Sequence, residues 1–465
     1  MFSQYFQTLQ NCFKVSELRS RIFFTLGILV VCRLISLIPI PGLDGATLTL
    51  FFNDLREAQM GDGTKRGLLD MYSMFTGGAL ERCAVGSLGI MPYISATIIL
   101  QLMSAVVPSL SKLKREEGGQ TQIIKYGRYL TVILCLGQGL VMSFGWENPG
   151  QIFTTWDAEK YGSLVDDPGW WYRIRTMLLL TTGTVLLMWL GEQISDRGIG
   201  NGISLVITVG IIARVDVAMA GMWEMFIGGK EAQGIILIAL LLAVVGVVIA
   251  VTQGMRKIPV QYAQRNVGRK MYQGGSTYFP LRVNYAGVMP IIFAQAILMF
   301  PSQIFGSVGR MMGNDDGLGK LLDNVGLALN YGSGWNLLMQ SLMILFFSYF
   351  WVATQFNETQ ISDDLKKAGG YIPGVRPGHA TRDFLHHAMS RLTLAGAMFL
   401  VVIAVIPTVM AVQFKIPFQI AQFFGGTSLL IMVGVMLDTM RQMESHLAQH
   451  HYDGFLKTGK VRGRF

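Results

Sequence analysis

Charged residues and cysteines are scarce in this sequence. Only 14% of the 465 residues are charged, against about 25% in a typical soluble domain, and 51% are hydrophobic. The four cysteines lie in the first third of the chain without a CxxC pair, which argues against a disulfide framework or a zinc site. No nucleotide-binding motif, nucleophile elbow or catalytic pair of carboxylates is visible. The composition therefore favours lipid as the main solvent and disfavours a soluble enzyme.

Apolar runs of about 20 residues recur along the chain, as membrane-spanning helices require. The first run follows three basic residues, as a signal sequence would, but no small-residue cleavage site follows it. We therefore expect a retained first helix and no separate soluble domain. The ten predicted spans are 22–39, 88–107, 129–146, 174–191, 201–220, 234–253, 287–307, 335–355, 392–412 and 420–437.

Basic residues are distributed unequally between the two sides that these spans define. Lys and Arg number 25 on the side of the N-terminus and 12 on the other side, which places both termini in the cytoplasm by the positive-inside rule. The predicted organisation is a cytoplasmic segment 1–21, a five-helix half 22–220, a second five-helix half 221–437 and a cytoplasmic tail 438–465.

We expect two long cytoplasmic loops, 254–286 and 356–391. The first contains six Lys and Arg residues and no acidic residue, with Tyr and Phe among them. Such a surface suits an acidic protein, RNA or anionic headgroups. Membrane topology alone would also explain basic loops on this side.

A short motif occurs once in each half. Gly89-Ile90-Met91-Pro92 opens the second span, and Gly287-Val288-Met289-Pro290 opens the seventh. Because five spans separate the copies, the second enters the membrane from the opposite face, which makes this an inverted repeat. Proline in the first turn of a span predicts a break or kink in both copies. The repeat places a pathway at the interface of the halves.

Several residues are candidates for lining such a pathway. Ile90 and Ile94, and likewise Ile203 and Ile207, are spaced i, i+4 and share a helix face, although lipid contact is the ordinary role of such residues. Arg33 is a charge within the first span, where snorkelling or structural pairing is the alternative to a functional role.

Two further segments have more than one interpretation. Residues 68–84 are apolar but too short to cross the membrane, and they predict either a re-entrant helix or an interfacial helix. The glycine-rich connection 191–202 superficially suggests a phosphate loop. It follows a membrane helix and lacks the Lys-Ser/Thr pair, so we expect a tight turn between helices.

Long motifs in this chain resemble the SecY family of protein-conducting channels. The resemblance runs from about residue 15 to 445. The motifs are IPIPG at 38–42, MFTGGALERCA at 74–84, LGIMPYISATII at 88–99, LMWLGEQISDRGIGNGIS at 187–204, LRVNYAGVMPIIFA at 281–294, YIPGVRPG at 371–378 and FFGGTSLLIMVGVMLD at 423–438.

The resemblance implies an all-α clamshell of two inverted five-helix halves, with the channel along its axis. The isoleucine ring of the family maps onto Ile90, Ile94, Ile203, Ile207, Ile292 and Ile431. The plug would be residues 68–80, including Leu68, Met71, Met74, Phe75, Gly77, Gly78 and Leu80, which favours the re-entrant interpretation. A lateral gate between the second and seventh spans would include Pro92, Ser95, Pro290 and Gln295.

The resemblance also implies partners and a location. Arg256, Lys257, Arg265, Arg269 and Arg376 map onto loops that would dock the SecA ATPase motor or a ribosome. Small membrane subunits of the SecE and SecG type would accompany the chain in a bacterial inner membrane. Unfolded precursor polypeptides and signal sequences would be the substrates, the lipid bilayer would receive apolar segments, and no cofactor is implied.

The sequence departs from the family pattern in two places. Residues 53–66 enlarge the first outside loop, and the tail after Leu447 matches nothing in the pattern. The alternatives are a secondary transporter, which would need polar residues at mid-membrane, and an intramembrane enzyme, which would need a catalytic dyad or metal cluster. Arg33 is the clear candidate for a charge at mid-membrane, so both alternatives have little support.

Overall fold

The computed structural model describes residues 13–61, 73–116, 118–152, 156–227, 231–262, 265–267, 270–272, 276–298, 305, 317–329, 333–414, 416 and 418–458. The chain divides into two compact units. The first contains Met1–Glu224, Phe305–Asp323 and Ile431–Phe465, and the second contains Met225–Ile304 and Asn324–Leu430. The first unit thus includes residues 431–437, which we predicted within the second half.

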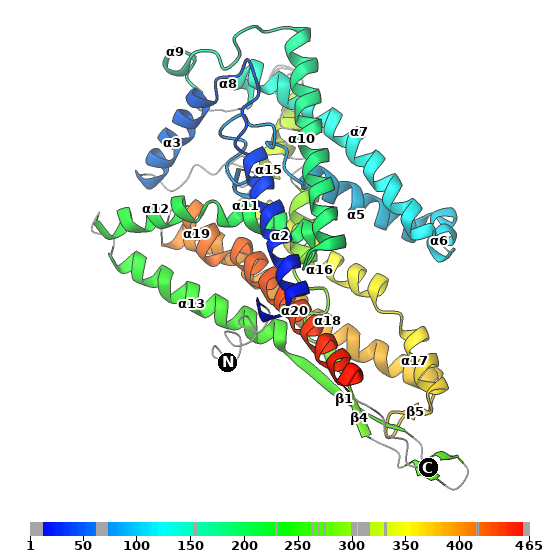
Figure 1. The fold of residues 1–465 in the computed structure, drawn as a ribbon. Helices are drawn as coiled ribbons and strands as arrows, with labels where there is room; N and C mark the ends of the chain where they lie inside the picture. Colours follow the sequence, from blue (N-terminus) through cyan, green and yellow to red (C-terminus); the bar gives the residue numbers. More distant parts are fainter. Residues whose placement is uncertain are drawn as a thin grey trace. The chain divides into compact units, whose positions relative to one another are not determined.

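Helices form most of the described structure (Figure 1). They are α2 (Ser16–Ile35), α3 (Gly45–Gly61), α5 (Met91–Val106), α6 (Pro108–Arg115), α7 (Gly119–Glu147), α8 (Pro149–Ile152), α9 (Ala158–Tyr161), α10 (Trp170–Arg197), α11 (Gly202–Ile212), α12 (Val215–Ile227), α13 (Glu231–Gln253), α15 (Gly317–Ala328), α16 (Gly334–Gln355), α17 (Glu358–Lys367), α18 (His379–Gln413), α19 (Phe418–Gly425) and α20 (Thr427–Thr458). The strands are β1 (Met255–Tyr262), β2 (Arg265–Val267), β3 (Lys270–Tyr272), β4 (Ser276–Arg282) and β5 (Gly370–Tyr371).

The helices agree with the predicted membrane spans. Seven helices in the described residues are long and apolar enough to cross a membrane, and the bent pair α5 and α6 brings the number to eight. The first predicted span corresponds to α2, and the seventh contains the shorter apolar helix Met289–Leu298. The chain is therefore an all-α polytopic membrane protein, with a small sheet that hydropathy did not predict.

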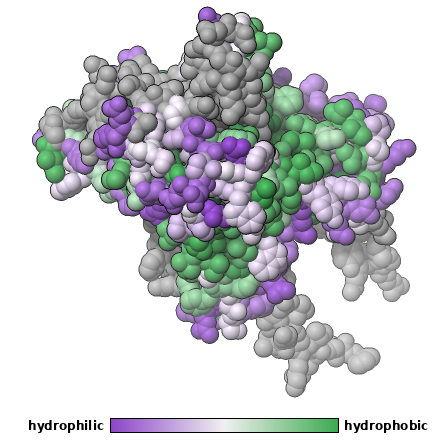
Figure 2. Space-filling view, turned by 90° about the horizontal axis from the view of Figure 1, so that it is seen from above, coloured by the Kyte–Doolittle hydropathy of each residue, from purple (hydrophilic) through white to green (hydrophobic). Residues whose placement is uncertain are grey.

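Large hydrophobic side chains are exposed on the membrane helices. On α13, Ile235 and Leu242 are 62% and 67% exposed. Figure 2 shows broad areas of hydrophobic surface beside hydrophilic ones. Apolar side chains exposed to this extent are unfavourable in water and favourable in lipid. These faces of the helices therefore contact lipid.

The first span ends earlier than predicted. Helix α2 stops at Ile35, and the next residues pair with the segment before α5. The amide of Ile40 donates to the carbonyl of Cys83, and the amide of Val85 donates to the carbonyl of Ile38. Proline at position 39 disfavours helix in the residue before it, which explains the early end.

The second span breaks near its predicted end. Helices α5 and α6 are bent by 104° at Val107, and Pro108 is the first residue of α6. Proline at this position cannot donate the hydrogen bond that would continue α5, but its φ angle suits a new first turn. Lys112, Lys114 and Arg115 follow in α6.

Both copies of the repeated motif contain the predicted break. Gly89 and Gly287 have φ angles of 58° and 64°, in the left-handed region that favours glycine. Helices begin two residues later, at Met91 and Met289. The same sequence pattern thus produces the same local backbone in each unit.

The connection between α10 and α11 is the predicted tight turn. Its amides donate to side chains from three helices: Ile199 to Thr25 Oγ1 in α2, Gly202 to Ser195 Oγ in α10, and Gly200 to Gln442 Oε1 in α20, at 2.8–3.1 Å. The contact of Gly202 satisfies an orphan amide in the first turn of α11, and the other two satisfy amides of the turn itself. The turn therefore joins distant parts of the first unit.

Helix α3 occupies the described part of the enlarged outside loop. Phe51 packs against Trp156 and Tyr161, with ring centroids 4.9 and 5.3 Å apart. The carboxylate of Asp54 accepts hydrogen bonds of 2.6 Å from Lys160 Nζ and from the Tyr161 hydroxyl. This aromatic and ionic contact joins α3 to α9.

The contact between α3 and α9 is expected to weaken in acid. The hydrogen bonds from Lys160 and then Tyr161 lower the pKa of Asp54. The contact therefore contributes stability above the unfolded-state pKa of about 3.9, and that stability is lost as pH falls through the lower folded-state pKa. Because the pair is exposed, the effect is local.

Hydrogen exchange of residues 45–55 would measure this effect. In the wild type, we expect protection of α3 to fall over that pH range. In Asp54→Asn, measured at the same pH values, protection should be lower at neutral pH and should not respond to pH. Equal pH responses in both proteins would contradict the prediction.

Candidate functional site

The predicted plug is buried where the structure describes it. Leu68 and Met71 lie outside the described residues, whereas Met74, Phe75 and Leu80 are buried. Gly77 and Gly78 have φ angles of 65° and 82° and turn the chain back on itself. These described residues form a short helix followed by turns, and the role of plug remains a prediction.

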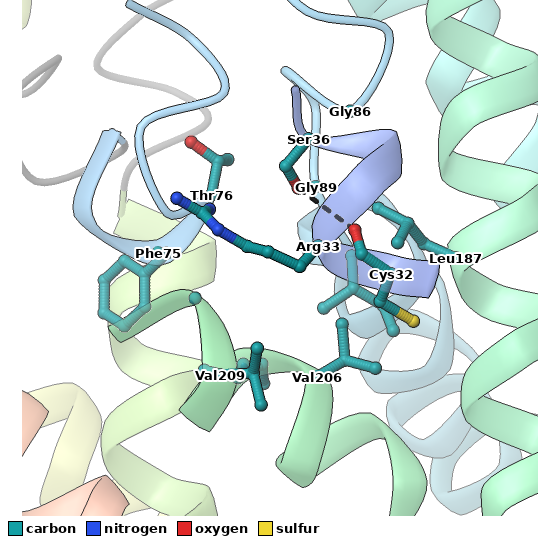
Figure 3. A pocket seen from close by; sticks show the side chains of 13 residues that line it. Cys32, Arg33, Ser36, Phe75, Thr76, Gly86, Gly89, Leu187, Val206 and Val209 are labelled. Atoms are coloured by element: carbon teal, nitrogen blue, oxygen red, sulfur yellow. Dashed lines mark hydrogen bonds between the residues drawn. The ribbon is translucent and has the colours of Figure 1, made fainter. Parts of the chain in front are cut away.

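Arg33 contacts this segment. Its guanidinium donates a 2.6 Å hydrogen bond to the carbonyl of Gly77. Figure 3 shows the side chain extending from α2 toward Phe75 and Thr76. Of the roles considered for this charge, structural pairing with the predicted plug is the one that the structure supports.

The segment also packs closely on α11. A Cβ atom at Gly210 would lie 2.5 Å from the carbonyl oxygen of Phe75, closer than real Cβ atoms approach backbone. The two backbones therefore touch where a larger residue would separate them. A Cβ atom at Gly77 would likewise lie 3.1 Å from the Cα of Gly210.

A buried ion pair lies beside this contact. Arg214 donates two hydrogen bonds to the carboxylate of Glu81, at 2.9 and 2.6 Å. The exposed fractions of these two side chains are 11% and 5%. Ser73 Oγ donates a third bond to Glu81, at 2.6 Å. This pair was not predicted. Arg214 lies between α11 and α12, which together form one candidate membrane span, Gly202–Ile227.

A small cavity lies between α2, α11 and the predicted plug. Its volume is about 30 Å³, and its lining includes Arg33, Phe75, Thr76, Ile90 and Ile207 (Figure 3). Two of the predicted ring residues thus share a space with two residues of the predicted plug segment. A volume of this size has room for about one or two water molecules.

The other four predicted ring residues do not line this cavity. Ile94 is buried one turn beyond Ile90 in α5, and Ile203 is partly buried in α11. Ile292, in the second unit, and Ile431, in α20, are both buried. Membership of a single ring remains a prediction for these four residues.

The residues of the predicted lateral gate belong to different units. Pro92 and Ser95 lie in the first turns of α5 in the first unit. Pro290 and Gln295 lie in helix Met289–Leu298 in the second, where Gln295 Nε2 donates a 2.9 Å hydrogen bond to Thr427. The gate itself remains a prediction.

The described residues of the basic loop 254–286 form β-strands, which the sequence analysis did not predict. Strands β1 and β4 pair antiparallel, and β5 adds to β1 to give the order β4-β1-β5 (Figure 1). Ile258 and Val260 are buried on one face with Leu281, whereas Arg256 and Lys257 are exposed.

The remaining docking residues are partly described. Arg376 is exposed after β5, and Arg265 lies in β2, whose side chains are not described. Arg269 lies outside the described residues. The exposed cations of the sheet fit an acidic partner surface.

Comparisons with known proteins give matches over most of this chain. The SecY family model matches residues 84–440. The protein translocase subunit SecY of Chlamydia trachomatis is 39% identical over 471 residues, which cover 98% of this chain and 99% of that protein.

Solved structures have the same fold. A protein-conducting channel covers 95% of this chain and 94% of its own, with a TM-score of 0.61 and 16% identity. A SecY channel whose plug domain stabilises the closed state gives a TM-score of 0.59 at 17% identity, with the same coverage. From the family match and the full-length similarity, this chain belongs to the SecY family of protein translocase subunits.

Proposed function

We propose that this chain is the central channel of a protein translocase. It passes unfolded secretory polypeptides through the membrane and releases transmembrane segments sideways into lipid. The observation that carries the proposal is the shared cavity, in which Ile90 and Ile207 lie beside Phe75 and Thr76. An isoleucine ring and a plug that meet at the same point of the channel would close it.

Aliphatic side chains suit the seal of such a channel. They contact an extended polypeptide without specific bonds, so many sequences can pass. When no polypeptide is present, a narrow apolar constriction resists water and ions by dewetting. The small volume of the cavity beside Ile90 and Ile207 supports a closed state of this kind.

Sideways release would sort segments by their transfer energies. A Leu residue at the centre of a span contributes about −0.5 kcal/mol to insertion, and an Arg residue costs about 3 kcal/mol. A segment rich in Leu would therefore leave through the gate between α5 and helix Met289–Leu298, and a polar segment would continue along the axis.

The energy for transport would come from partners. The exposed cations Arg256, Lys257 and Arg376 would dock the SecA motor or a ribosome, and subunits of the SecE and SecG type would complete the complex. The distribution of basic residues supports a bacterial inner membrane location with cytoplasmic termini and docking loops. The chain would carry out no reaction of its own.

Ion conductance of the purified complex in planar bilayers tests the channel. We expect near silence from the wild type. Deletion of 68–80, or the double change Ile94→Gly and Ile207→Gly, should give frequent large currents because each removes part of the seal.

The matched control is Ile238→Gly, a change of the same kind on the exposed face of α13. It should remain as silent as the wild type. If the deletion and the ring variant are also silent after their insertion is confirmed, the assignment of the channel is wrong.

A further inference from the structure

The Glu81–Arg214 ion pair has no part in the ring, the gate or the docking surface. Both hydrogen bonds between the two side chains are short, and they run in parallel from one guanidinium to one carboxylate. This bidentate geometry fixes the direction as well as the distance of the contact. A pair of buried charges in a membrane protein needs an explanation, because charges there are costly.

The pair joins the plug segment to the fifth span. Glu81 directly follows Leu80, the last residue of the predicted plug, and Arg214 lies at the break between α11 and α12. Ser73 donates to the same carboxylate, and the amide of Gly78 donates to the carbonyl of Ser73 at 2.8 Å. One carboxylate thus ties both ends of residues 73–81 to the fifth span.

Other contacts of the segment do not depend on this carboxylate. Arg33 holds the carbonyl of Gly77, and Phe75 rests against Gly210. Thr49 Oγ1 donates to the backbone carbonyl of Glu81. These contacts are hydrogen bonds to backbone carbonyls and a close approach of backbone atoms. None of them involves the Glu81 side chain, so they remain when that side chain is changed. The contribution of the charge can therefore be separated from that of packing.

A buried ion pair suits a plug that has to close and open the channel reversibly. Desolvation offsets much of the attraction between two buried charges. The pair therefore fixes the orientation of the contact more than it adds to the net stability of the fold. When the plug leaves its seat, water entering the channel would hydrate both charges and offset the loss of their contact. Removing one partner has a different result, since it leaves the other charge buried without compensation.

We propose that Glu81 and Arg214 are positioning residues that latch the plug in its closed position, and that opening separates them. This inference rests on the proposed function, because it presumes that residues 68–80 close the channel. It assigns the closed state to a specific contact between the plug and the fifth span.

Conductance of the purified complex in planar bilayers tests the latch. We expect Glu81→Gln to raise the open probability about tenfold, since the buried Arg214 then favours a hydrated, open state. The exchanged pair, Glu81→Arg with Arg214→Glu, should restore closure toward the wild-type level. Rescue by exchange would not occur if each side chain acted only through its own packing.

A second variant covers the case in which Glu81→Gln does not fold. Replacing both residues by apolar ones, Glu81→Leu with Arg214→Met, leaves no unpaired charge, so we expect wild-type thermal stability in detergent. It should conduct as seldom as the wild type, because Leu and Met lose their mutual contact and gain no hydration when the plug leaves its seat. If it conducts often while deletion of 68–80 also conducts, disturbed packing at this site causes the currents; the latch is then refuted and the plug stands. If the deletion is silent, both proposals fail.

Discussion

Gly202→Leu is expected to prevent accumulation of folded protein. A Cβ atom at position 202 would lie 1.9 Å from the carbonyl oxygen of Gly191 and 2.8 Å from Ile194 Cβ. Both contacts are with α10, so the larger side chain would force α10 and α11 apart and break the turn between them. A loss of several kcal/mol is a large part of a typical stability of about 5–15 kcal/mol.

Gly137→Leu provides the control for this variant. Gly137 is also in a membrane helix, α7, but it is exposed and has no atom within 4 Å of an added Cβ. The amount of full-length protein in the membrane fraction and its melting temperature in detergent would be compared. Equal values for the two variants would show that the α10–α11 contact adapts to a side chain.

Reversing two charges of the hairpin is expected to stop partner-driven transport. Arg256 and Lys257 are exposed near the start of β1, so Arg256→Glu with Lys257→Glu would replace attraction to an acidic partner by repulsion. We expect at least about a tenfold lower rate of precursor transport into proteoliposomes with the ATPase motor. Ion conductance should remain low, because the ring and plug are unchanged.

The control exchanges the two cations, Arg256→Lys with Lys257→Arg, and keeps the charge. It should transport at close to the wild-type rate if attraction is electrostatic. Higher salt should slow the wild type more than the reversed variant, since screening weakens attraction between exposed charges. A reversed variant with a normal rate would remove these residues from the docking surface.

Much of the membrane architecture could be predicted from short windows of sequence. Hydropathy over about 20 residues depends on local composition, and helices α7, α10, α13 and α16 lie where it placed spans. The sheet was missed because the basic loop was assessed only by its charge. The alternation of Ile258 and Val260 with exposed residues was a signal for β1 that could have been used.

The contacts of the candidate site were less predictable. The segment 68–84 was predicted to be re-entrant only through family motifs, since its length and hydropathy fit an interfacial helix equally well. Glu81 and Arg214 are 133 residues apart, so no local window contains both. Arg214 and the nearby Asp216 lie within a predicted span, and charges in a span are a sequence signal for a functional or paired site that was not used here.

The turn between α10 and α11 also has a consequence for biosynthesis. The buried amide of Gly200 donates to Gln442, 242 residues later in the chain. At about 5–20 residues per second, the ribosome makes that partner on the order of 10–50 seconds after Gly200 itself. During that interval the amide has to be satisfied by water or another group. Helix α20 thus completes a turn that was made much earlier, and the turn between α10 and α11 reaches its final structure only after α20 has been synthesised.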